Sequence, residues 1–180
     1  MNFLKIKNFL LVFLIIFSYL ISVVKTYAVD ITADRTISSS SDGDQYNIKT
    51  NNDIDVIVTN NSTLERNQKI FNVSASSLTG SSITIHLGSS VIAETNSIFS
   101  NGAELTITNT GTIEATNSKA INVSNSDGVS ITNNKNGVIK SNNNTILGDA
   151  GTGADNVTID NSGEIYTTAT GTESSAIVFA

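Results

Sequence analysis

The 180-residue chain has no cysteine, no proline and no tryptophan, and only 14% of its residues are charged. Without disulfides, a protein of this size must be held together by a continuous core. The residues that remain are rich in Asn, Ser, Thr and Ile. Isoleucine and threonine favour strands, whereas asparagine and glycine favour turns. Beyond residue 28, no long stretch has the Ala, Leu, Glu and Lys content that helices prefer. The composition therefore predicts an all-β protein with polar turns.

The first 28 residues differ from the rest of the chain. Lys5 and Lys7 precede an uncharged, mostly apolar run that reaches Val24, and the segment ends in the small residue Ala28. This is the layout of a secretory signal peptide. A membrane anchor is the alternative, because the run is close to spanning length, but no stop-transfer pattern follows. We expect residues 1–28 to be a signal peptide, cleaved between Ala28 and Val29.

The charges are distributed unevenly along the chain. All 16 acidic residues, but only seven of the ten basic ones, lie beyond residue 28, so residues 29–180 carry a formal charge of −9. Such a surface disfavours nucleic acid and anionic membranes as partners. We predict no nucleic-acid partner, and no motif indicates a cofactor.

One phrase recurs along the chain, in residues 105–113, 129–139 and 157–165. It reads apolar, hydroxyl, Ile, polar, Asn, then Gly, polar, Ile, and its second copy has two residues inserted before the glycine. A repeat of this kind decides the fold. The apolar residues that mark successive units have a mean spacing of about 25 residues and are Val56, Ile83, Leu105, Val129 and Val157. Side chains within a unit alternate with period two, which excludes a helical repeat.

Each unit holds three short apolar runs separated by polar turns, which is the pattern of one coil of a parallel β-helix. Alternate side chains of a coil point inward and stack on the same position of the next coil. We predict a right-handed parallel β-helix, a solenoid of about five coils, over residues 53–180. A polar leader or cap over residues 29–52 would precede it.

The repeats also predict which residues stack. The expected core ladder is formed by Ile85, Ile107, Ile131 and Ile159. Asparagine and glycine suit left-handed turns, so the expected turn residues are Asn109, Gly111, Gly137, Asn161 and Gly163. Asn109, Asn133 and Asn161 would line up along one corner and bond to one another in a ladder.

The leader, the cysteine-free Asn/Ser/Thr-rich repeats and the Asn-x-Gly-x-Ile phrase resemble the passenger domains of Gram-negative autotransporters and related β-helical adhesins. The resemblance covers about residues 53–180 and is specific for architecture. It implies export through the inner membrane and exposure at the cell surface, associated with the outer membrane. It also implies a non-enzymatic role as an adhesin or a structural surface stalk.

The resemblance implies partners as well. In the family, a C-terminal β-barrel in the outer membrane delivers the passenger to the surface, and this sequence has no such barrel. The chain ends in an apolar strand at 176–180, where a solenoid would need a polar cap. We therefore expect the chain to be the N-terminal part of a longer polypeptide that contains the barrel. A host or surface ligand would be the second partner.

Several short patterns bear on catalysis or metal binding. Gly148-Asp-Ala-Gly151 resembles the surroundings of a serine nucleophile but has alanine in place of the serine, and we expect His86 to be solvated. The segment 151–155 resembles one calcium repeat, without tandem copies. An EF-hand starting at Asp42 would need glycine at Asn47. We predict no catalytic residue and no metal site.

Two alternatives to the adhesin stay open. A β-helical carbohydrate-active enzyme would use carboxylates on one face, and we expect Glu114 and Glu164 to share an outward position, with Lys140 between them. An ice-binding β-solenoid is less favoured, because the alternating threonines from Thr106 to Thr112 are not repeated. Binding is expected in the loops after the second strand of each coil, which are 116–119, 141–144 and 167–175.

Overall fold

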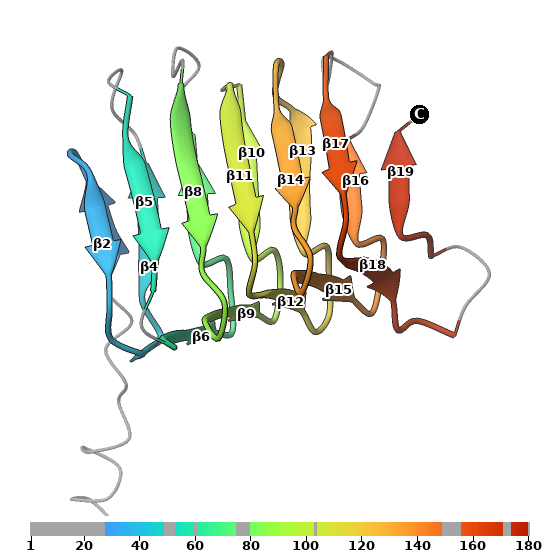
Figure 1. The fold of residues 1–180 in the computed structure, drawn as a ribbon, viewed down its shortest axis with the longest axis horizontal. Helices are drawn as coiled ribbons and strands as arrows, with labels where there is room; N and C mark the ends of the chain where they lie inside the picture. The colour runs from blue at the N-terminus through green and yellow to red at the C-terminus, as the bar shows by residue number, and fades with distance from the viewer. Residues whose placement is uncertain are drawn as a thin grey trace, which may run out of the picture.

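The structure is a computed structural model that describes residues 28–48, 53–59, 61–74, 80–102, 104–148, 156–170 and 174–179. Its strands form three parallel sheets that wind together as a β-solenoid (Figure 1). Nothing in these ranges forms a helix that could span a bilayer. The predicted all-β fold of stacked parallel coils is confirmed. The predicted signal peptide lies outside the described residues, apart from Ala28 at the start of β1.

The three sheets take their strands in turn along the chain. Sheet A contains β1 (Ala28–Ile31), β4 (Gln45–Ile48), β7 (Phe71–Val73), β10 (Ile98–Asn101), β13 (Ile121–Asn125), β16 (Ile146–Gly148) and β19 (Ile177–Phe179). Sheet B contains β2 (Arg35–Ile37), β5 (Asp55–Val58), β8 (Ser81–Ile85), β11 (Leu105–Asn109), β14 (Ser130–Asn133) and β17 (Thr158–Asn161). Sheet C contains β3 (Ser41–Asp42), β6 (Thr63–Arg66), β9 (Ser90–Ala93), β12 (Thr112–Ala115), β15 (Val138–Ser141) and β18 (Glu164–Thr167).

Each coil passes through sheets B, C and A in that order. The described residues beyond 53 form five coils, beginning at β5, β8, β11, β14 and β17. One further coil, β2 to β4, and the single strand β1 precede them and pair in register with the next coil. The solenoid therefore starts N-terminal of Asp53, within the segment predicted to be a leader or cap. Polar residues of that segment stand opposite buried apolar ones of the next coil: Arg35 pairs with Val56, and Ser41 pairs with Leu64.

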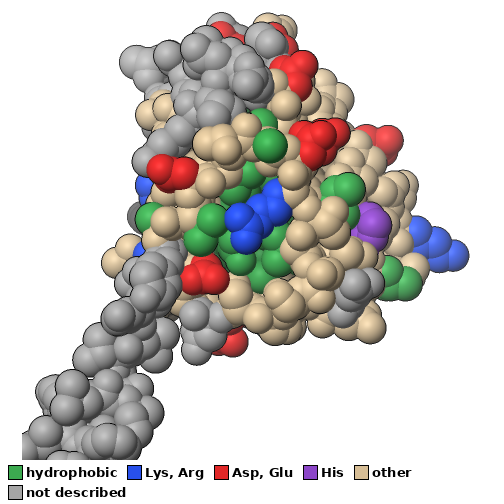
Figure 2. Space-filling view, turned by 90° about the vertical axis from the view of Figure 1, so that its left-hand side faces the viewer, with side chains coloured by type: hydrophobic (Ala, Val, Ile, Leu, Met, Phe, Trp, Pro, Cys, Tyr) green, Lys and Arg blue, Asp and Glu red, His purple; other side chains and the backbone are tan. Residues whose placement is uncertain are grey.

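Arg35 closes the N-terminal end of the core. Its register partner is Val56, so it occupies a position that is inward and apolar in the coils that follow. Its guanidinium lies 5.6 Å from the ring centroid of the buried Tyr46, a cation–π contact. Figure 2 looks onto this end of the solenoid and shows basic side-chain atoms in the middle of hydrophobic ones. A charged group thus occupies a position that is apolar in the coils that follow.

The core consists of inward columns that run through the stack. In β11, Leu105, Ile107 and Asn109 are buried, while Thr106 between them is exposed. The central column of sheet B joins Val56, Ile83, Ile107, Ile131 and Ile159.

The predicted ladder is therefore wrong in one member: Ile83, and not Ile85, pairs with Ile107. Ile85 pairs with Asn109 instead. Because side chains alternate with period two, a slip of two residues keeps an inward residue inward, and the sequence pattern alone does not reveal it.

The corner between sheets B and C has two forms. In three coils it is a turn closed by a backbone hydrogen bond from the fourth residue to the first, at 59–62, 86–89 and 134–137. The third residue of each turn has positive φ: Asn61 (56°), Gly88 (83°) and Asn136 (76°). The other form is the shorter corner around Gly111 and Gly163. The two residues inserted in the 129–139 phrase thus build the longer turn.

Gly111, Gly137 and Gly163 do not have positive φ, in contrast to the prediction from the sequence. They are needed because neighbouring coils approach closely. A Cβ on Gly111 would lie 2.3 Å from the Ser89 carbonyl oxygen, and one on Gly163 would lie 2.3 Å from the Gly137 carbonyl oxygen. Steric exclusion between coils therefore requires these glycines.

The C-terminal coil is less covered than the others. Ile159 and Ile165 pack against the core but are only partly buried. Ile177 and Phe179 of β19 are 42% and 44% exposed. Within the described residues, Arg35 thus lies over the core at the first coil, whereas Ile177 and Phe179 are exposed at the last.

Candidate functional site

The corner between sheets C and A carries polar side chains in four successive coils. We name it the C–A ridge and define it as residues 67–70, 94–97, 116–120 and 142–145, which link the second strand of a coil to the third. Two of the three loops expected to bind a ligand contribute to it. Since its segments stack from coil to coil, the ridge runs along the solenoid.

Side chains on the ridge bond from one coil to the next. Asn117 Nδ2 donates to Glu94 Oε1 at 2.9 Å, and Asn142 Nδ2 donates to Asn117 Oδ1 at 3.5 Å. Ser118 Oγ donates to Asn96 Oδ1 at 3.3 Å. These contacts hold neighbouring segments in register, so the ridge is a firm surface on a rigid scaffold.

A first groove lies on the sheet C side of the ridge, with a volume of about 410 Å³. Its lining mixes charges, because Arg66 stands among Glu65 and Glu94. Arg66 lies in the inward column of Ala93 and Ala115, and its Nε and Nη1 are buried without hydrogen-bond partners among the described residues. Burial lowers the pKa of Arg66, an effect that nearby Asp44 opposes. The Arg66 guanidinium therefore occupies space that the small side chains of Ala93 and Ala115 leave open.

A second groove, which we name the sheet A groove, lies on the other side of the ridge and has a volume of about 590 Å³. Its lining contains four carboxamides, two hydroxyls and one ammonium group: Gln45, Gln68, Asn72, Asn96, Thr95, Ser118 and Lys69. No carboxylate is among these residues, although the chain as a whole is acidic. The sheet A groove is therefore locally neutral to positive.

Lys69 is held in place by an aromatic ring. Its ammonium lies 3.6 Å from the centroid of the Phe99 ring, within the range of a cation–π contact. Phe99 points outward from β10, opposite to its inward neighbour Ile98. Burial lowers the pKa of Lys69, because desolvation disfavours the charged form. Among the described residues Lys69 has no ion-pair partner.

The carboxylate pair expected at Glu114 and Glu164 does not form. Glu114 pairs in register with Lys140, and Lys140 pairs with Tyr166, whereas Glu164 pairs with Val138. Glu164 is the first residue of its strand and Glu114 the third, so the two acids belong to different outward columns. The sequence comparison missed this offset for the same reason as at Ile85: a difference of two residues preserves the outward face.

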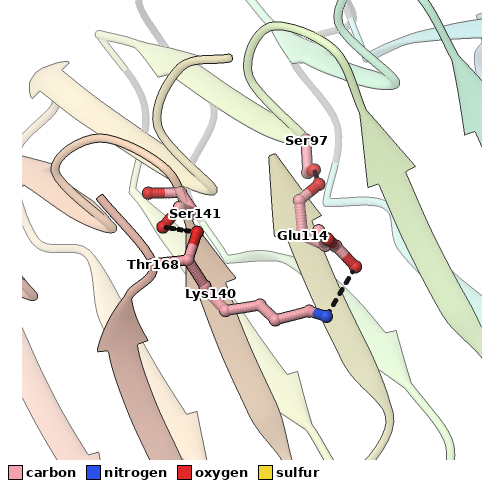
Figure 3. Close-up of polar contacts among 5 residues, drawn as sticks. All are labelled: Ser97, Glu114, Lys140, Ser141 and Thr168. Atoms are coloured by element: carbon pink, nitrogen blue, oxygen red, sulfur yellow. Dashed lines mark hydrogen bonds and ion pairs between the residues drawn. The ribbon is translucent and has the colours of Figure 1, made fainter. Parts of the chain in front are cut away.

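Glu114 instead forms an ion pair. Figure 3 shows Lys140 reaching across to Glu114, with Nζ 3.0 Å from Oε2. The hydrogen bond to Glu114 raises the pKa of Lys140, and the charges of Glu114 and Tyr166 act in the same direction against desolvation. In the same region Ser97 Oγ donates to the Glu114 carbonyl, and Thr168 Oγ1 donates to the Ser141 carbonyl at 3.1 Å. Glu114 is thus neutralised within the sheet.

Of the remaining candidates, the structure describes His86 and the threonines of sheet B. His86 is exposed, as expected, and its Nδ1 lies 3.1 Å from Thr59 Oγ1. Asp149, Ala150 and the segment 151–155 are outside the described residues. No group of metal-ligating side chains forms in the part of the chain that the structure describes. On the outer face of sheet B, Thr108 has Thr84 and Thr132 as register partners, so its row of threonines extends over three coils.

Sequence reasoning missed the residues of the sheet A groove. Phe71, Ile98 and Ile121 are register partners in sheet A. The residues two positions before them, which are Lys69, Asn96 and Lys119, are therefore equivalent in successive coils. The signal that could have found them is this equivalence, which needs the third strand of every coil to be aligned. The markers used for the repeat were all in the first strand.

No known protein family, curated protein or solved structure matches the chain. The fold and the arrangement of the C–A ridge therefore carry the functional argument on their own.

Proposed function

We propose that the chain is an exported, non-enzymatic β-solenoid that is displayed on the cell surface as an adhesin or surface stalk, in the manner of an autotransporter passenger. The observation that carries the proposal is the C–A ridge: a polar, internally bonded surface that repeats over successive coils of a rigid scaffold. Surfaces of this kind suit binding to an extended or multivalent partner.

Charge and sequence support the same proposal. The acidic balance of residues 29–180 keeps a protein soluble and separate from nucleic acid. The apolar leader supplies a route for export. No second function is favoured, because Glu114 is held by Lys140 and Glu164 stands in another column, so these two acids do not form the pair that a glycosidase needs.

Export is tested by producing the full chain in a Gram-negative host. We expect a processed form in the periplasm whose N-terminal residue, read by Edman degradation, is Val29. Deleting residues 2–28 is the control and should leave the protein in the cytoplasm. A full-length, unprocessed protein in the cytoplasm of the parent strain would contradict the proposed export.

Display is tested by fusing the chain upstream of an autotransporter-type outer-membrane barrel and treating intact cells with protease. We expect the fused solenoid to be cleaved from intact cells while a periplasmic marker stays protected. A solenoid that becomes accessible only after the outer membrane is broken would rule out the surface role.

A further inference from the structure

We propose that the sheet A groove binds a glycan that carries a single carboxylate, with Lys69 contacting the carboxylate and the surrounding carboxamides contacting the sugar hydroxyls. The inference deepens the proposed function, on which it rests, by naming the ligand class of the C–A ridge. It follows from three properties of the groove: its hydrogen-bonding groups, its charge and its size.

Each of the four carboxamides of the groove forms a hydrogen bond within the protein through one of its two polar atoms. Gln45 Nε2 and Asn72 Nδ2 both donate to Asn47 Oδ1, the second at 3.3 Å. Gln68 Oε1 accepts from Arg66, and Asn96 Oδ1 accepts from Ser118.

The other end of each amide has no hydrogen-bond partner among the described residues. Gln45 and Asn72 thus present carbonyl acceptors, while Gln68 and Asn96 present NH₂ donors. A hydroxyl group both donates and accepts, so a ligand with several hydroxyls matches this mixed set. A purely anionic ligand such as phosphate would match only the donors. The groove is therefore built for a polyol, of which glycans are the biological class.

Lys69 adds a charge requirement. Its ammonium is fixed over Phe99, lies at the groove, and forms no ion pair among the described residues. An anionic ligand would supply the ion-pair partner that Lys69 lacks among the described residues. A charge-assisted hydrogen bond is also stronger than a neutral one. Because a nearby carboxylate favours the charged form, ligand binding should also raise the lowered pKa of Lys69.

The balance of charge around the groove limits the ligand to one carboxylate. Lys69 is the single cation that lines it, and the formal charge of the whole chain is −6. A polyanionic polymer would meet repulsion from the rest of the surface. The volume of about 590 Å³ lies within the range of small-molecule sites. A short, terminally acidic glycan fits both conditions.

The probes are a sialylated trisaccharide, a glucuronic-acid disaccharide, and lactose as the neutral reference. Each is titrated into the purified full chain, with binding followed by calorimetry and by the side-chain amide signals of Asn and Gln in NMR spectra. We expect an acidic probe to bind at least ~10-fold more tightly than lactose. The shifted signals should belong to Gln45, Gln68, Asn72 and Asn96. The two acidic probes distinguish a sialic-type from a uronic-type ligand.

The variants isolate the charge of Lys69. Lys69→Met keeps an aliphatic stem over Phe99 and should weaken binding of the acidic probe ~10-fold while leaving lactose binding unchanged. Lys69→Arg should restore most of the affinity. Lys119→Met is the matched control, since Lys119 occupies the equivalent ridge position of a coil further on but does not line the groove. It should bind like the parent.

Three results would overturn the inference: no binding of either acidic probe, equal loss in the Lys69→Met and Lys119→Met variants, or signal shifts away from the groove. Circular dichroism melting of each variant separates loss of the ligand from loss of the fold. Export and surface display are measured without any glycan. A displayed protein that binds no acidic glycan contradicts this inference alone, whereas a glycan-binding protein that stays in the cytoplasm contradicts the surface role alone.

Discussion

Asn109 Nδ2 donates to Asn133 Oδ1 at 2.8 Å, and Asn133 Nδ2 donates to Asn161 Oδ1 at the same distance. Asn109 and Asn133 are fully buried. Asn133 Nδ2 also lies within hydrogen-bond distance of the carbonyl oxygens of Gly137 and Glu164. The asparagine ladder thus satisfies polar groups that would otherwise be buried at a penalty. It also fixes the register of these three coils, because a slip would break the hydrogen bonds between the amides.

Removing the central amide should destabilise the fold. Asn133→Ala leaves the Asn109 side chain without its partner above and the Asn161 side chain without its partner below. We expect the free energy of unfolding to fall by roughly 1–3 kcal/mol, the range for a buried polar group left unpaired. Urea denaturation followed by circular dichroism measures it. Lys135→Ala, an exposed position of the neighbouring turn, is the control and should unfold like the parent; equal midpoints for both variants would contradict the role of the ladder.

The ladder was predictable from the sequence, because Asn109, Asn133 and Asn161 occupy the same place in a phrase that keeps its spacing. The identity of inward residues was predictable for the same reason. Register was harder, as the two-residue error at Ile85 shows. The first coil was missed because Arg35 stands at an inward position, where the sequence pattern calls for an apolar residue.

The candidate site was less accessible to sequence reasoning than the fold. The loops at 116–119 and 141–144 were expected to bind, and both belong to the C–A ridge. The sheet A groove, however, arises from residues of four different coils, among them Gln45, Lys69, Asn96 and Ser118. Their proximity depends on the stacking of segments of unequal length. No local pattern in the chain records that proximity.

Two neighbouring residues of one turn should differ in how much stability is lost when a Cβ is added or removed. Gly137→Ala would place a methyl group 2.3 Å from Asn133 Oδ1 and 2.7 Å from the Asn109 carbonyl oxygen. We expect a loss of ~1–3 kcal/mol, typical of overpacking. Asn136 has a φ of 76°, which glycine adopts freely, so Asn136→Gly should change stability by less than ~1 kcal/mol. Thermal melts of the two variants compare them, and a larger loss in Asn136→Gly would contradict the crowding at Gly137.

The Glu114–Lys140 pair should make a small, pH-dependent contribution. Its side chains are 25% and 28% exposed, so we expect Lys140→Met to lower the free energy of unfolding by ~0.2–1 kcal/mol at neutral pH. The pKa of Lys140 is raised in the folded state. Its contribution is therefore complete below the unfolded value of 10.5 and is lost as the pH rises through the folded pKa.

Urea denaturation of parent and Lys140→Met across the alkaline range tests the sign. The two stabilities should converge above the folded pKa of Lys140, and Glu114→Gln should reproduce the loss seen at neutral pH. A difference that grows with rising pH would show that the ion pair does not stabilise the fold.

Adjacent residues of β11 offer the most direct test of the coil itself. Ile107 is fully buried between Ile83 and Ile131, whereas Thr106 points outward and is exposed. Ile107→Ala should lower the free energy of unfolding by ~2–5 kcal/mol through the lost contacts and the cavity, and Thr106→Ala should change it by less than ~0.5 kcal/mol. Ile107→Asp buries a charge between apolar layers, which is costly enough to abolish the cooperative transition seen by circular dichroism. Because the two residues share a strand, any general weakness of β11 would affect both alanine variants alike. Only the inward orientation of Ile107 predicts that they separate, and equal losses would show that the assigned face is wrong.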